Sequence, residues 1–192
     1  MMSALTRVPM VAEITVHEQL WWFVARSGGI VALALAAASV IWGLLLTTRA
    51  AGDKPRPAWL LDLHKFLGAL SVVFTAVHVI ALMLDNYVSF GLTDIFVPMA
   101  SSWQPGPVAW GIVAMYLLVA VQASSMMMRK LPRKLWRAIH MLSFGVFGAG
   151  VVHGFTAGTD ASNPVYVGVS VAAIIVTVFL TTYRVLAPGR GR

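Results

Sequence analysis

Five long apolar stretches, separated by short polar or proline-rich connections, dominate the pattern of this 192-residue chain. Each is long enough to cross the roughly 30 Å hydrocarbon core of a bilayer as an α-helix, which needs about 20 residues. None shows the two-residue alternation of a membrane β-barrel. The pattern therefore predicts an all-α membrane protein, a single domain (1–192) built as a five-span helix bundle, with spans at about 28–47, 59–84, 107–127, 135–156 and 165–186.

Two connecting segments have a character of their own. The longest connection, about 85–106, is expected to be a loop because Pro98, Pro105 and Pro107 lie in or beside it. Ahead of the first span, an amphipathic segment ends in Trp21 and Trp22 and is expected to anchor at the membrane interface. His17 lies in that segment, and we expect it to be an exposed polar residue rather than a ligand.

The composition agrees with a membrane protein and limits the kinds of cofactor that the chain could bind. The chain is 59% hydrophobic and 11% charged, which is more apolar than soluble domains are. It contains no cysteine, which excludes thiolate-bound iron–sulfur clusters, disulfides and haem attached through cysteine. A haem would therefore be a non-covalent b-type haem held by imidazole.

The basic residues predict the orientation of the helices. Connections on the cytoplasmic side of a membrane carry an excess of Lys and Arg. Apart from Arg7 and Arg26, the basic residues fall in three regions. These are the connection into the second span, the connection into the fourth span, and the C-terminal tail. We therefore predict an integral plasma (inner) membrane protein with its N-terminus outside and its C-terminus cytoplasmic. This topology also accounts for the net charge of +7, so no nucleic acid partner is expected.

Four of the five histidines fall inside the apolar spans in two pairs. His64 and His78 are 14 residues apart in the second span, and His140 and His153 are 13 apart in the fourth. Each pair covers roughly 20 Å along a helix. Because both spans are predicted to run outward, His64 and His140 share the inner side and His78 and His153 the outer side. Two imidazoles fill both axial positions of a haem iron, so the pattern predicts two b haems stacked between spans 2 and 4.

The spacing in the fourth span does not fit an ideal helix. Fourteen residues bring His78 to within about 40° of the face of His64, whereas thirteen leave His153 roughly 140° from His140. Either the fourth helix is distorted, or the two haem planes are rotated about the bundle axis. Three intervening glycines would permit a bend or close cofactor approach and fit small-residue helix packing equally well: Gly145, Gly148 and Gly150.

The sequence around these histidines resembles the ferric reductase-like transmembrane family, which includes the membrane half of NADPH oxidases. The resemblance covers about residues 20–186. It rests on the 14- and 13-residue spacings and on the segments RSG (26–28), LDLHK (61–65), VH (77–78), LWRAIH (135–140), VHG (152–154) and GTD (158–160). It implies an inner haem on His64 and His140, an outer haem on His78 and His153, and electron flow from the cytoplasmic face outward.

Several basic residues are candidates for binding haem propionates, which seek Arg and Lys donors. The resemblance implies that Arg26 approaches the outer haem, at a propionate or where the acceptor takes electrons. Lys65 and Arg137 lie close in sequence to the inner histidines, as does Arg133. The excess of positive charge on the cytoplasmic side explains these inner residues as well.

The chain also departs from the reductases of that family. Only about six residues follow the last predicted span, no glycine-rich dinucleotide turn is present, and the usual first span is absent. We therefore expect a separate electron donor, either a flavoprotein reductase or a quinol. The expected outer acceptor is Fe(III) or a partner enzyme, since short members of the family serve beside separate enzymes such as a periplasmic methionine-sulfoxide reductase. Whether the chain is an enzyme in its own right stays open.

Three other functions remain as alternatives. A quinol-oxidising cytochrome b subunit would also use four histidines to hold two haems, although this sequence lacks the Pro-Glu-Trp-Tyr motif of the quinol site. A cofactor-free scaffold or transporter could use the histidines only for hydrogen bonds between helices. A zinc site is disfavoured because it needs three or four converging ligands and each pair supplies two.

Overall fold

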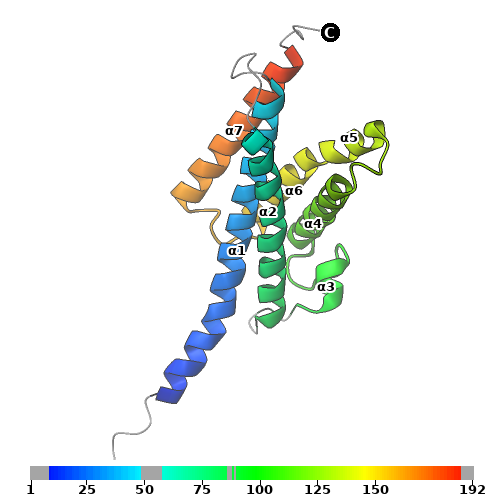
Figure 1. Ribbon diagram of the computed structural model, residues 1–192. Helices are drawn as coiled ribbons and strands as arrows, with labels where there is room; N and C mark the ends of the chain where they lie inside the picture. The colour runs from blue at the N-terminus through cyan, green and yellow to red at the C-terminus, as the bar shows by residue number, and fades with distance from the viewer. Residues whose placement is uncertain (1–8, 49–57, 86–87, 89, 187–192) are drawn as a thin grey trace, which may run out of the picture.

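The computed structural model describes residues 9–48, 58–85, 88 and 90–186, with the side chains of the first helix from Gln19 onward. Every regular element in this part of the chain is a helix (Figure 1). In chain order these are α1 (Pro9–Thr48), α2 (Ala58–Leu84), α3 (Leu92–Phe96), α4 (Pro105–Met126), α5 (Arg133–Met141), α6 (Ser143–Thr156) and α7 (Pro164–Leu186).

The five predicted spans are confirmed. Five helical segments are long and apolar enough to cross a membrane: Gln19–Thr48, Ala58–Leu84, Pro105–Met126, Arg133–Thr156 and Pro164–Leu186. Only 11–22% of the residues in their most apolar windows are buried within the protein. The remaining apolar surface needs lipid to cover it, because a helix hides its own backbone polar groups but not its side chains. The chain is an integral membrane protein.

The first helix is longer than predicted. It begins at Pro9 rather than near residue 28, so the segment with Trp21 and Trp22 is continuous with the first span, and its anchoring at the membrane interface stays a prediction. The reason is local, since residues 10–27 contain no proline or glycine that would end a helix. His17 lies in this helix, and its side chain is outside the described residues.

The connection between α2 and α4 is not wholly a loop. It contains the short helix α3, and α4 begins at Pro105, inside the segment predicted to be loop. Proline suits the first turn of a helix because the N–H it lacks would have no partner there. The Tyr116 hydroxyl donates to the Phe96 carbonyl at 2.5 Å and ties the end of α3 to α4.

The fourth span is interrupted, as the first of the two alternatives from the histidine spacing required. α5 ends at Met141, α6 begins at Ser143, and the Leu142 amide donates three residues back to Ile139 at 3.0 Å. This tighter turn changes the angular relation between His140 and His153.

The glycines of the fourth span lie beyond this break. A Cβ atom on Gly145 would lie 3.1 Å from the Leu117 side chain, and one on Gly150 would lie 3.1 Å from the Leu33 side chain. Nothing lies within 4 Å of a Cβ placed on Gly148. Gly145 and Gly150 therefore allow close packing between helices.

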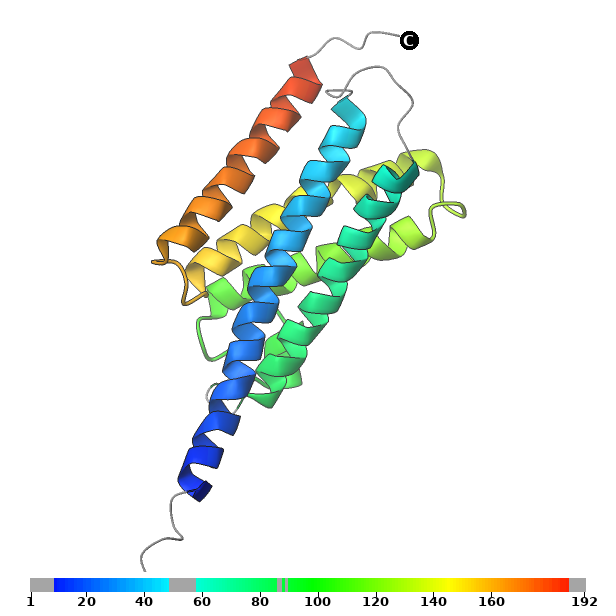
Figure 2. The same cartoon turned by 60° about the vertical axis from the view of Figure 1, so that its left-hand side comes forward.

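The long helix α1 holds the bundle together. It contacts α2, α6 and α7, while α4 packs against α5 and α6 (Figure 2). The Trp42 indole of α1 donates to the Leu60 carbonyl of α2 at 3.0 Å, near one end of this antiparallel pair. The arrangement brings α2 and the broken α5–α6 helix to face each other, with α1 and α4 beside them.

Candidate functional site

The structure brings the four histidines together in the two predicted pairs. The ring centres of His64 and His140 are 5.9 Å apart, with an angle of 71° between their planes. Those of His78 and His153 are 6.3 Å apart, with an angle of 75°. α2 and the α5–α6 helix therefore run in the same direction, and each contributes one histidine to each pair.

These separations suit two imidazoles on one metal ion. An imidazole nitrogen lies about 2.0–2.1 Å from a bound metal, so two axial imidazoles put their ring centres roughly 6 Å apart. Within the described chain no three His, Asp or Glu side chains gather closely enough to hold a metal ion. Each pair thus fits an ion that takes its other ligands from elsewhere, as haem iron takes four from the porphyrin.

Three of the four rings are oriented by backbone carbonyls. The Nδ1 atom of His64 lies 3.0 Å from the Ser39 carbonyl oxygen. That of His78 lies 2.6 Å from Ala25 O. A carbonyl only accepts, so Nδ1 carries the proton in both cases and Nε2 keeps its free lone pair.

The third carbonyl belongs to α4. The Nδ1 atom of His153 lies 2.9 Å from the Pro107 carbonyl oxygen and donates to it for the same reason. Ligating histidines characteristically donate their other ring N–H in this way, because the bond fixes the tautomer and the ring orientation. The second nitrogen of each ring is left to bind a metal.

A glycine follows each of these carbonyls by four residues and makes room for the imidazole. A Cβ atom on Gly29 would lie 3.0 Å from Nδ1 of His78, and one on Gly43 would lie 3.1 Å from Cε1 of His64. On Gly111 it would lie 2.8 Å from both Nδ1 and Cε1 of His153. We call each combination of a carbonyl and the glycine four residues later a carbonyl–glycine notch: Ala25/Gly29, Ser39/Gly43 and Pro107/Gly111.

His140 is held differently. Its Nδ1 lies 3.4 Å from the Ser125 hydroxyl of α4, a longer contact than the other three. Its ring stacks on Trp136, one turn earlier in α5, with the ring centres 5.2 Å apart and the planes at 27°. The Trp136 Nε1 atom is buried and has no hydrogen-bond partner in the described structure. A buried indole N–H without an acceptor is costly, and an anionic group at this position would satisfy it.

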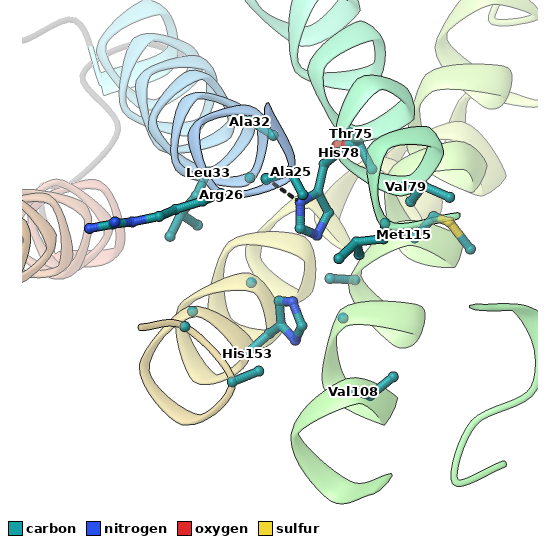
Figure 3. A pocket seen from close by; sticks show the side chains of 18 of the residues that line it. Ala25, Arg26, Ala32, Leu33, Thr75, His78, Val79, Val108, Met115 and His153 are labelled. Atoms are coloured by element: carbon teal, nitrogen blue, oxygen red, sulfur yellow. Dashed lines mark hydrogen bonds between the residues drawn. The ribbon is translucent and has the colours of Figure 1, made fainter. Parts of the chain in front are cut away.

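A cavity of about 340 Å³ surrounds the His78–His153 pair, a size typical of sites for small molecules and cofactors. Figure 3 shows the two rings pointing toward one another across it, with Val108 and Met115 of α4 nearby. The connection before α4 covers one side through Ile95 and Trp103. The cavity is therefore largely apolar and has an imidazole on either side.

Acidic residues stand where this cavity meets the connections. Asp85, Asp94 and Asp160 all line it. Asp85 is buried, and its Oδ1 atom has no hydrogen-bond partner among the described residues. Asp94 accepts from the Gly91 amide at 2.8 Å.

Arg26 also lines this cavity, and its partner is Asp160. The Arg26 Nε atom donates to Asp160 Oδ2 at 2.6 Å, and its Nη2 atom pairs with the other carboxylate oxygen. Trp22 lies against the guanidinium, with its ring centre 5.0 Å from the Arg26 Cζ atom. The Arg26 side chain extends away from the two imidazole rings (Figure 3). The hydrogen bond from Arg26 holds the pKa of Asp160 below its ordinary value.

The predicted basic residues near His64 and His140 lie on the outside of the helices. The Lys65 ammonium is 3.2 Å from Asp62 Oδ1, and both side chains are exposed. Arg137 is exposed on α5, three residues before His140. The binding of propionates by Lys65, Arg137 and Arg26 stays a prediction.

The notches and Ser125 were missed in the sequence, although their spacing carried a signal. Gly29 and Gly43 are 14 residues apart, as are Gly111 and Ser125. This equals the spacing of His64 and His78, and a 14-residue repeat keeps residues near one face of a helix. Small residues repeated with the period of the histidines mark the helices that hold the rings.

The chain matches a known protein family over more than half of its length. Residues 28–151 match the family described as ferric reductase like transmembrane component. The match includes His64, His78 and His140 and ends two residues before His153. No curated protein and no solved structure matches the chain significantly.

Proposed function

Because this chain belongs to the ferric reductase-like transmembrane family, we propose that it transfers electrons across a membrane through two b-type haems, each held by one of its histidine pairs. The family match suggests transmembrane electron transfer in general. The number of haems, their ligands and the direction of transfer are our proposal. We call the haem proposed for His64 and His140 the inner haem, and that for His78 and His153 the outer haem.

The observation that carries this proposal is the placement of the two histidine pairs. Both have ring centres near the separation of two axial ligands, at 5.9 and 6.3 Å. In three of the four rings a carbonyl holds the Nδ1 proton, so Nε2 is the nitrogen free to bind iron. Hydrogen bonds between helices would account for the Nδ1 contacts of these rings but not for the matched spacing of the two rings in each pair.

The surroundings supply what such a group needs. A b haem held by one of these histidine pairs would supply an iron that can alternate between Fe(III) and Fe(II). The buried Trp136 N–H beside His140 is a donor for an inner propionate. Lys65 and Arg137 could reach one from the helix surface, and Arg26 stands at the outer cavity.

We propose that the His64 end faces the cytoplasm, in keeping with the distribution of basic residues. Electrons would then enter at the inner haem, from a separate flavoprotein reductase or from quinol. They would leave from the outer haem to Fe(III) or a partner enzyme. The acidic residues lining the outer cavity favour a cationic acceptor.

The test is a pyridine haemochrome assay on the purified full-length protein, made with adequate haem supply, together with a dithionite-reduced spectrum. We expect about two b haems per chain, both low-spin because both axial positions are filled. Nearly perpendicular imidazole planes should also give a strongly anisotropic low-spin EPR signal in the oxidised protein. One haem per chain would leave a single working pair, and no haem would overturn the proposal in favour of a scaffold or transporter.

A further inference from the structure

The exception among the four histidines is informative because the other three follow one rule. His64, His78 and His153 each donate to a backbone carbonyl that lies four residues before a glycine. His64 also lies 3.4 Å from the Ser39 hydroxyl, in addition to its carbonyl. Within the described structure, Nδ1 of His140 contacts a hydroxyl alone, at 3.4 Å against 2.6–3.0 Å for the three carbonyl contacts.

Ser125 occupies the position where a fourth notch would lie. α4 carries the Pro107/Gly111 notch, and 14 residues further along come Val121 and Ser125. In α1 the same 14-residue step separates the Ala25/Gly29 notch from the Ser39/Gly43 notch. The hydroxyl of Ser125 therefore stands in the place that glycine leaves open at the other three positions.

The hydrogen bonds of Ser125 determine what it offers to His140. Its hydroxyl donates to the Val121 carbonyl at 2.7 Å, so its proton is already used. Toward His140 the oxygen can then only accept, and Nδ1 of His140 carries the proton. The Ser125 side chain thus stands between His140 and the Val121 carbonyl, and its hydroxyl oxygen is a weaker acceptor for the His140 N–H than a carbonyl would be.

The acceptor on Nδ1 influences a metal bound at Nε2. A strong acceptor makes the imidazole more basic, which stabilises Fe(III) relative to Fe(II) and lowers the reduction potential. A long contact with a neutral hydroxyl does this less than a short one with a carbonyl. We propose that Ser125 is a positioning residue for His140 and that it holds the reduction potential of the inner haem above the value a fourth carbonyl–glycine notch would give. This inference rests on the proposed function, since it requires a haem on His64 and His140.

Two small substitutions at Ser125 should move the potential in opposite directions. Ser125→Gly removes the hydroxyl and the Cβ that stand between His140 and the Val121 carbonyl, which keeps the Ser124 hydroxyl as a side-chain donor. It should lower the midpoint potential of one haem. Ser125→Ala removes the acceptor while its Cβ still stands in the notch, and it should raise the same potential. Ser125→Thr keeps the hydroxyl and should stay near the wild-type value.

The neighbouring serine is a matched control. The Ser124 hydroxyl donates to the same Val121 carbonyl at 3.0 Å, and its own hydrogen bond is to that carbonyl and not to His140. Ser124→Ala should therefore leave both potentials unchanged. A general effect of disturbing α4 would appear in this variant too.

The measurement is a spectroelectrochemical redox titration of each purified full-length variant, after its haem content has been counted. A His78→Ala background, in which the inner haem is expected to remain, identifies the potential that moves. Opposite shifts for Ser125→Gly and Ser125→Ala would support the inference, and if the glycine variant does not fold, the contrast between alanine and threonine decides. Unchanged potentials, or shifts of the same sign, in haem-loaded variants would overturn it while leaving the proposed function intact. A wild-type protein without haem would overturn both.

Discussion

The two histidine pairs have similar geometry but are held by different chemistry. Their ring separations, 5.9 and 6.3 Å, and interplanar angles, 71° and 75°, are close. At the His78 end both rings donate to carbonyls. At the His64 end, His64 contacts the carbonyl and the hydroxyl of Ser39, whereas His140 contacts the Ser125 hydroxyl. Helix packing therefore sets where the rings lie, and the acceptor on the far nitrogen can vary without moving them.

The ends also differ in their surroundings. Asp85, Asp94 and Asp160 line the cavity at the His78 end, together with the connection that precedes α4. At the His64 end, the exposed residues of α5 include Arg133, Lys134 and Arg137, and His140 lies in that helix. The His78 end is thus partly enclosed and carries three carboxylates against the one guanidinium of Arg26, whereas the exposed face of α5 at the His64 end is basic. This difference agrees with opposite sides of a membrane.

The independence of the two histidine pairs is tested most directly by removing one histidine. His64→Ala should remove the inner haem and largely spare the outer one, because His78 and His153 are held by other carbonyls. The ratio of haem to chain should fall to about half, and one of the two midpoint potentials should disappear. His153→Ala should do the converse.

His17→Ala is the matched control, since the fifth histidine lies outside both pairs, and it should retain both haems. Equal loss of both haems in every single-ligand variant would show that the two sites do not form independently.

A smaller effect is expected from filling a notch. In Gly111→Ala the new Cβ would lie 2.8 Å from two ring atoms of His153, so the imidazole must shift away from the Pro107 carbonyl. Overpacking of this kind costs about 1–3 kcal/mol, and we expect partial loss of the outer haem and a lower melting temperature. Gly43→Ala, with a 3.1 Å contact to His64, should affect the inner haem less.

Gly148→Ala provides the comparison, because nothing lies within 4 Å of the added Cβ. It should keep the full haem content and melt at the wild-type temperature or slightly above. Haem loss in Gly148→Ala as large as in Gly111→Ala would mean that the notch is not the cause.

The smallest effect concerns the Arg26–Asp160 pair, present only at the His78 end. Its hydrogen bond lowers the pKa of Asp160 in the folded protein, so its stabilisation is complete above the ordinary value of 3.8 and is lost as the pH falls through the lower folded value. Asp160→Asn should therefore lower the melting temperature near pH 7 by a few degrees at most, since Arg26 is partly exposed.

Below pH 4 the wild type should approach the variant. Thermal unfolding of the detergent-solubilised protein between pH 3 and pH 7 measures this. A difference that stayed constant across that range would assign the effect to something other than the charge of Asp160.

Hydropathy was sufficient to predict the spans, but local helix geometry was not. α2, α4 and α7 begin and end within two residues of their predicted bounds. The start of α1 was missed because a polar, tryptophan-rich segment can continue a helix out of the apolar region when nothing in it ends the helix. The 13-residue spacing made a distorted fourth helix one of two alternatives. It could not locate the break at Leu142, because leucine has no local tendency to break a helix.

The histidine pairs could be predicted and their supports could not. Pairing follows from depth and direction, both of which can be read from spacing and charge. The acceptors at residues 25, 39 and 107 are main-chain atoms, so no residue type reveals them. Ser125 shows only as a small residue 14 positions after Gly111, and the significance of that spacing depends on knowing which helices face each other.

The use of main-chain acceptors has an evolutionary consequence. A carbonyl oxygen is the same in every amino acid, so the residue at 25 can be replaced without changing the acceptor offered to His78, and a replacement at 39 keeps the carbonyl while losing the hydroxyl 3.4 Å from Nδ1 of His64. Selection would act instead on the residues four places later, where any added side chain displaces a ring. Among descendants of this protein, Gly29, Gly43 and Gly111 should therefore outlast the residues that make the hydrogen bonds, and position 125 should vary wherever a different driving force between the two ends is advantageous.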